Sequence, residues 1–204
     1  MLRNNENILN KIIKIQSWYR KIKIKIIKDN FSKKILEDTI ILYNNIYQYY
    51  NNINKQLINK KMRKPNYPSE ITENIVKFAI KKYYGVIPTW DTKKGDLFLF
   101  DKQLEVKGSL DLYNGGPSSF GPQESWHRIY FVDCKNHDNL IFKVFEVKLS
   151  NDSEIWKNLK INKSQTFKEQ CDEKRRPRIK FYDLMKQIPK EYINIIFHGN
   201  INEL

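Results

Sequence analysis

The stretch that decides the fold is Gly95-Asp-Leu-Phe-Leu-Phe-Asp-Lys-Gln-Leu-Glu-Val-Lys-Gly-Ser109. Residues 97–100 are apolar or aromatic, residues 101–103 form a polar break, and residues 104–106 resume an apolar strand pattern. Two short runs of this kind on either side of a polar turn predict a β-hairpin.

The hairpin gathers charged side chains. Because side chains alternate between the two faces of a strand, we expect Glu105 and Lys107 to share one face, with Val106 pointing into the core. In an antiparallel pair, Asp96 at the start of the first strand lies beside the end of the second strand. Two carboxylates and one ammonium group are therefore expected to converge.

This combination predicts a metal-dependent phosphodiester hydrolase. Carboxylate oxygens are hard ligands that suit Mg²⁺, which commonly takes one or two carboxylates and completes its shell with water and phosphate oxygens. A neighbouring lysine can orient or deprotonate the attacking water, while the metal stabilises charge on phosphorus. The alternative is that Glu105 and Lys107 are two solvated residues on an edge strand, because so short a pattern recurs by chance.

Asp96 followed by Glu105-Val106-Lys107 resembles the core motif of the PD-(D/E)XK nucleases, and within them the type II restriction endonucleases. Gly95 stands where that motif usually has proline. The run from Gly116 to Pro122, followed by Trp126 and Ile129-Tyr-Phe131, is also similar to these enzymes. The resemblance covers residues 65–190 and implies a mixed α/β core, with a central mixed sheet flanked by helices.

The resemblance also implies an activity. It is Mg²⁺-dependent cleavage of both strands of DNA, usually by a homodimer. Asp96 and Glu105 would bind the metal, the Val106 carbonyl would add a ligand, and Lys107 would activate water.

A helix precedes the hairpin. Residues 69–84 carry an apolar stripe at helical spacing, Ser69 is the expected N-cap, and Gly85 is the expected stop. In the resembling nucleases such a helix often adds an acidic residue to the metal site, and Glu73, one turn inside the helix, is the candidate here. Glu70 lies in the first turn, where it complements the helix dipole. In the alternative interpretation both glutamates are ordinary surface residues.

The composition favours a polyanionic partner. The chain has 204 residues with 37 Lys and Arg against 23 Asp and Glu, a net charge of +14, which attracts a phosphate backbone. Double-stranded DNA is the expected partner, and an acidic membrane surface is the second possibility. Two cysteines without metal-ligand spacing indicate neither a zinc module nor a disulfide framework, so a soluble, intracellular protein is expected. No apolar run reaches the length of a membrane span.

Residues 1–64 differ in charge from residues 65–204, the expected catalytic domain. They hold 15 Lys and Arg against 4 Asp and Glu, a net charge of +11. Apolar residues at helical spacing predict a hairpin of two helices, within residues 8–26 and 31–57, for DNA contact or dimerisation. Residues 15–25 resemble the IQ motif that binds calmodulin-type proteins, but a basic amphipathic helix produces this pattern readily, so no such partner is expected.

Several side chains are candidates for contacts to DNA. The Gly/Pro-rich loop after the hairpin offers hydroxyls and backbone amides, and a basic cluster near residue 176 offers guanidinium forks that match phosphate. The alternative for both is a solvated loop. The candidates are Ser118, Ser119, Gln123, Arg128, Lys174, Arg175, Arg176 and Arg178.

A second Asp then Glu-x-Lys set competes with the first. Residues 128–133 and 140–149 predict two further strands, and they carry Asp133 and Glu146-Val147-Lys148. The first set is preferred because a helix with acidic residues precedes it and a polar loop follows it. Residues 154–159 and 181–187 predict helices, and residues 192–197 predict a last strand.

The function expected from all these features is that of a Mg²⁺-dependent, sequence-specific DNA endonuclease of the restriction type. Two alternatives remain open. A structure-specific or repair nuclease would use the same residues on another substrate, and a non-catalytic DNA-binding protein would need no divalent metal.

Overall fold

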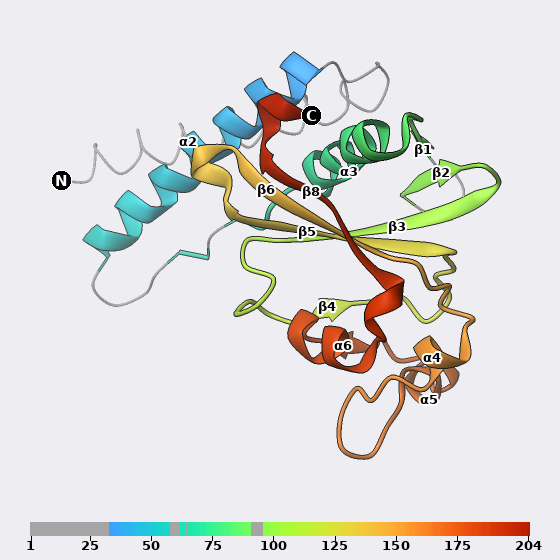
Figure 1. Ribbon diagram of the computed structural model, residues 1–204. Helices are drawn as coiled ribbons and strands as arrows, with labels where there is room; N and C mark the ends of the chain where they lie inside the picture. Colours follow the sequence, from blue (N-terminus) through green and yellow to red (C-terminus); the bar gives the residue numbers. More distant parts are fainter. Residues whose placement is uncertain (1–32, 58–61, 64, 91–95) are drawn as a thin grey trace. The chain divides into compact units, whose positions relative to one another are not determined.

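The computed structural model describes residues 33–57, 62–63, 65–90 and 96–204 (Figure 1). The chain divides into two units, Met1–Ile35 and Leu36–Leu204. This division falls at residue 35, earlier than the boundary at residue 64 expected from the charge distribution. The helix predicted within residues 8–26 and the motif of residues 15–25 lie outside the described residues.

Helices and strands follow one another in a mixed α/β order. The helices are α2 (Lys33–Gln56), α3 (Ser69–Tyr84), α4 (Glu154–Lys157), α5 (Phe167–Asp172) and α6 (Phe181–Gln187), with short 3-10 turns η1 (His137–Asn139), η2 (Lys190–Tyr192) and η3 (Ile201–Glu203). The strands are β1 (Thr89–Trp90), β2 (Leu97–Leu99), β3 (Lys102–Ser109), β4 (Ser118–Ser119), β5 (Arg128–Asn136), β6 (Ile141–Val147), β7 (Arg178–Ile179) and β8 (Ile193–Asn200). Among the helices of the described residues, including the 24-residue α2, none combines the length and apolar character of a membrane span.

Six strands form one mixed sheet in the order β1-β2-β3-β5-β6-β8. The pair β3 and β5 is parallel, and the other neighbours are antiparallel. Strands β4 and β7 form a separate two-stranded sheet. The predicted mixed α/β class with a central mixed sheet flanked by helices is confirmed for the described residues.

The two faces of the sheet carry different layers (Figure 1). Helix α3 packs on the face that includes Gly108, where an added Cβ would lie only 2.3 Å from Cγ2 of Thr72. The opposite face, which includes Ile129 and Phe131, packs against β4, α4, α5 and α6. That second layer builds the main apolar core around Trp126 and Trp156.

Helix α2 begins close to where the spacing of apolar residues predicts. Its buried side chains include Leu36, Ile40 and Tyr43. Asn44 donates a 2.8 Å hydrogen bond to the carbonyl of His137 in η1, and the Tyr43 and His137 rings meet at 5.8 Å. These contacts explain why α2 from Leu36 onward belongs to the same unit as the sheet.

Some predicted details differ from the structure. Gly85 ends α3 in the left-handed region at φ 76°, as expected, but Ser69 is the first helical residue rather than the N-cap. Its hydroxyl donates to Glu70 instead. Residue Pro68 takes the N-cap position without a side-chain bond, since proline's fixed φ suits a helix entry. Helix α5 and the two-residue strands β1, β4 and β7 were not predicted.

Candidate active site

The hairpin of β2 and β3 places Asp96 beside Glu105. Residue Leu97 pairs with Leu104, and the Asp96 amide donates to the Leu104 carbonyl at 3.3 Å. One carboxylate oxygen of Asp96 accepts a 2.7 Å hydrogen bond from the Val106 amide. Directly opposed residues of an antiparallel pair project to the same face, so the Asp96 and Glu105 side chains lie on one side of the sheet.

The turn that sets this register has two residues. Phe100 and Asp101 both have positive φ, 48° and 60°, and they connect the paired residues Leu99 and Lys102. This is the two-residue turn whose twist matches that of the flanking strands. The turn is tighter than the three-residue break predicted, because Lys102 and Gln103 already belong to β3.

Lys107 completes the cluster on the same face. Its ammonium group forms an ion pair with Glu105 and lies 3.7 Å from an oxygen of Glu124. It also lies 5.6 Å from the centre of the Phe120 ring. The Lys107 side chain keeps 21% of its surface exposed and that of Glu105 only 6%. The ammonium can therefore reach a bound molecule, while Glu105 is held beneath it.

The surroundings disfavour negative charge on these carboxylates. Burial, together with Asp96 and Glu124, raises the pKa of Glu105 to about 7 against the opposing effect of Lys107. For Lys107, burial acts to lower the pKa, but Glu105, Glu124 and Asp96 outweigh it and raise the pKa. An excess of carboxylates around one ammonium is relieved when a second cation enters.

Glu73 lies on α3, which packs on the face of the sheet opposite Glu105 and Lys107, but it is close enough for the charges of the cluster to act on its carboxylate. Burial raises its pKa to about 8, and the charges of Asp96, Glu70 and Glu105 add to the effect. The contact between Thr72 and Gly108 fixes the distance of this turn of α3 from β3. Glu70 lies in the first turn of the helix, as expected for a residue that complements the helix dipole.

The donor set suits a hard cation. Asp96 and Glu105 offer two adjacent carboxylates, the number that Mg²⁺ commonly takes from a protein. The N–H and C=O of one strand residue project to the same edge, as in paired strands, so the Val106 carbonyl points to the edge where its amide meets Asp96. Within the described residues, no three acidic, histidine or cysteine side chains form a preformed metal cage, so water and phosphate would complete the shell.

The second Asp then Glu-x-Lys set does not converge. Asp133 pairs with Lys143 and Glu146 pairs with Tyr130, without a bulge between them. Asp133 and Tyr130 are three residues apart on one strand, so Asp133 and Glu146 project to opposite faces. Glu146 is fully buried and accepts hydrogen bonds from four side chains: Tyr84, Arg128, Tyr130 and Asn194. This geometry is that of a structural carboxylate.

Two of the segments expected to contact DNA lie together. Strand β4 pairs with β7, so that Ser119 faces Arg178 and Ser118 faces Ile179. The Phe120 amide donates to the Pro177 carbonyl at 3.0 Å. The loop after the hairpin therefore lies beside the basic cluster, on the face where Lys107 lies over Phe120. The members of this cluster are all exposed: Lys174, Arg175, Arg176 and Arg178.

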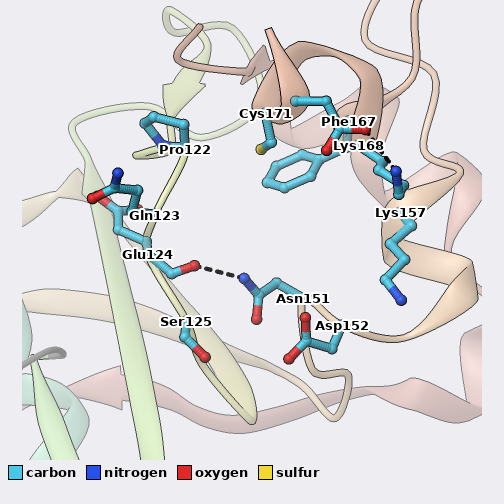
Figure 2. A pocket seen from close by; sticks show the side chains of 11 residues that line it. Pro122, Gln123, Glu124, Ser125, Asn151, Asp152, Lys157, Phe167, Lys168 and Cys171 are labelled. Atoms are coloured by element: carbon cyan, nitrogen blue, oxygen red, sulfur yellow. Dashed lines mark hydrogen bonds and ion pairs between the residues drawn. The ribbon is translucent and has the colours of Figure 1, made fainter. Parts of the chain in front are cut away.

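Gln123 and Arg128 have different surroundings. Gln123 is exposed and lines a cavity of about 320 Å³ between residues 122–125, residues 151–152 and α5 (Figure 2). Arg128 pairs with Leu104 across β3 and β5, on the face opposite Glu105, and its guanidinium donates to Glu146 at 2.9 Å. The structure therefore does not bring Arg128 together with the other predicted DNA contacts.

Glu124 lies beside the site, and the sequence did not predict this position. It lies beyond the loop, 19 residues after Glu105, yet its two carboxylate oxygens approach Lys107 at 3.7 Å and Arg176 at 3.8 Å. The turn pattern Gly121-Pro122 before it was the available signal, because such a turn reverses the chain toward the strand it left.

A family model described as Bsp6I restriction endonuclease matches residues 33–188. This range covers more than half of the 204 residues and includes α2, the hairpin, the loop and the basic cluster. No curated protein and no solved structure matches the chain. The family is one of restriction enzymes, which implies DNA binding. The chain belongs to the Bsp6I restriction endonuclease family.

Proposed function

We propose that this protein is a Mg²⁺-dependent endonuclease that cuts both strands of DNA at a specific sequence, with a site of the PD-(D/E)XK type. The observation that carries the proposal is the bond from the Val106 amide to Asp96, since it holds the Asp96 carboxylate against the strand that carries Glu105 and Lys107. A mixed sheet flanked by helices is compatible with the restriction-endonuclease core.

Asp96, Glu105 and the Val106 carbonyl would hold the cation. When bound, Mg²⁺ would polarise a water molecule and stabilise the negative charge that develops on the phosphoryl oxygens. The raised pKa of Glu105 supports this fit, because a carboxylate whose charge is disfavoured by burial and by like charges gains from a nearby cation.

Lys107 and Glu73 would act on the water. Neighbouring carboxylates raise the pKa of Lys107, so its ammonium remains charged at neutral pH and would orient the water and the scissile phosphate by donating hydrogen bonds. Glu73 would accept a hydrogen bond from the same water. The water oxygen would bond to phosphorus and release a proton to solvent, the phosphorus–oxygen bond to the leaving sugar would break, and the leaving oxygen would take a proton from solvent.

The basic cluster would hold the DNA backbone. Arginine forks match phosphate oxygens. Arg175, Arg176 and Arg178 are exposed and lie in or next to β7, the strand that pairs with β4 of the loop after the hairpin. Ser118, Ser119 and Gln123 would contact phosphates or base edges. Cutting both strands requires two active sites facing opposite strands, which a homodimer would supply.

Two matched alanine variants test the assignment. Lys107→Ala should abolish Mg²⁺-dependent cleavage of plasmid DNA and keep sequence-specific binding, whereas Lys148→Ala should cleave like the wild type. Lys148 is the control because it occupies the corresponding place in the second Glu-Val-Lys sequence and is exposed. Retained cutting by Lys107→Ala, or loss of cutting in Lys148→Ala alone, would reject the assignment.

A further inference from the structure

The Lys107 ammonium has two carboxylate neighbours, Glu105 and Glu124. In the proposed function the cation would bind only the first of them. Glu105 is its ion-pair partner and is also a ligand for the cation in the proposed function. An oxygen shared with a divalent cation binds an ammonium less strongly. Lys107 therefore needs a second partner when the site is loaded.

Glu124 is in the right place to be that partner. Its Oε2 lies 3.7 Å from the Lys107 ammonium, is buried, and has no hydrogen-bond partner within the described part of the protein. A buried carboxylate oxygen beside an ammonium group is strongly driven to pair with it.

The backbone holds Glu124 in this position. Its amide donates to the Gly121 carbonyl at 3.3 Å, and its carbonyl accepts a 2.7 Å bond from Asn151 (Figure 2). The side chain folds across Gly121, where an added Cβ would lie 2.7 Å from Oε1. Two hydrogen bonds thus hold the backbone of Glu124, and its carboxylate lies against Gly121.

The other oxygen of Glu124 points toward the DNA-contact segment. Oε1 lies 3.8 Å from the Arg176 guanidinium, whose side chain is 61% exposed. One carboxylate therefore bridges the lysine of the site and an arginine of the basic cluster.

We propose that Glu124 is a positioning residue that holds the Lys107 ammonium against the scissile phosphate during cleavage. This inference rests on the proposed function. It differs from a metal-ligand role because the contact of Glu124 is with Lys107, and from a DNA-contact role because a carboxylate repels phosphate.

The test compares Glu124→Gln, Glu124→Ala and Glu124→Asp with the wild type. We expect the first two to lower the single-turnover cleavage rate at saturating protein and Mg²⁺ by about 100-fold, the scale of a 1 Å misplacement of a catalytic group. The aspartate variant keeps the charge and should recover part of the rate. The control Glu191→Gln changes an exposed glutamate of η2 and should cleave like the wild type.

Two further measurements separate positioning from other roles. DNA affinity without divalent metal, measured by fluorescence anisotropy, should change by less than about threefold, because Glu124 makes no favourable contact with phosphate. The half-saturating Mg²⁺ concentration should also stay the same. A rate loss that high Mg²⁺ restores would make Glu124 a metal ligand, and a parallel loss of DNA affinity would make it a structural or DNA-binding residue; either result overturns the inference.

The inference and the proposed function fail in different ways. If the wild type cuts, Lys107→Ala does not, and Glu124→Gln cuts at the wild-type rate, then only the positioning role is rejected. If the wild type cuts no DNA with Mg²⁺, the proposed function is rejected and the positioning role with it.

Discussion

Replacement of Gly108 by alanine should loosen the contact between α3 and β3. A Cβ at this position would lie 2.3 Å from Cγ2 of Thr72 and 2.9 Å from its Cβ and Oγ1. Carbon atoms pack favourably at about 3.5–4.0 Å, so the helix and the strand must separate by about 1 Å or more. Neither partner is the end of a long flexible side chain, so the backbone must move.

The cost of this overpacking is about 1–3 kcal/mol. For a domain of this size each kcal/mol lowers the melting temperature by about 2–4 °C, so a decrease of about 2–12 °C is expected. Thr72 precedes Glu73, so the same shift moves Glu73 away from Asp96 and Glu105. Cleavage at a temperature where the variant is folded should therefore fall by up to about 100-fold, the scale of a 1 Å misplacement near the reacting groups.

Urea unfolding and single-turnover cleavage measure both effects. Gly116→Ala is the matched control, because a Cβ there meets nothing within 4 Å and should change stability by less than about 0.5 kcal/mol. Thr72→Ala removes the atom nearest to the new methyl group, along with a 2.8 Å bond to the Ser69 carbonyl. In that background the penalty of Gly108→Ala should shrink by about 1 kcal/mol or more.

Two results would refute this reasoning. One is a Gly108→Ala protein as stable as the wild type within about 0.5 kcal/mol. The other is an equal penalty in the Thr72→Ala background, since the steric contact would then not be the cause.

Three further predictions concern stability, pH and salt. Glu146→Ala leaves Arg128 and the hydroxyls of Tyr84 and buried Tyr130 without their acceptor, and chemical denaturation should show a loss of about 3–5 kcal/mol. A loss below about 1 kcal/mol would show that water replaces the carboxylate. Burial lowers the pKa of His137 in the folded protein from its ordinary value of 6.5, so near and below that pH the unfolded chain binds more protons than the folded chain. The free energy of unfolding should therefore fall as the pH decreases through 6.5. His137→Gln should remove this part of the pH dependence. Arg178→Gln should reduce the slope of log affinity for DNA against log salt by about one unit, and an unchanged slope would place Arg178 away from the phosphates.

The hairpin was predictable because its signals are local. Alternation along the strand assigns Glu105 and Lys107 to one face from two residues of sequence, and antiparallel pairing then brings Asp96 to the same side. The helix that carries Glu73 was equally clear from its apolar stripe and from Gly85.

The remaining parts of the site depend on contacts between distant residues. The pairing of Ser119 with Arg178 joins segments 59 positions apart, and no local pattern encodes it. The same holds for Glu124, whose approach to Lys107 requires the loop to return to β3. Arg128 had suitable chemistry for DNA, but strand register places it on the other face with Glu146.

A digest of a mapped plasmid with purified protein and Mg²⁺, followed by sequencing of the ends, tests the central claim most directly. We predict discrete fragments whose ends all fall at one short sequence, and no cutting when a chelator removes the metal. Cutting at many unrelated or structured positions would indicate a structure-specific or repair nuclease. An intact plasmid, or cutting that persists with chelator, would contradict a Mg²⁺-dependent restriction site built on Asp96, Glu105 and Lys107.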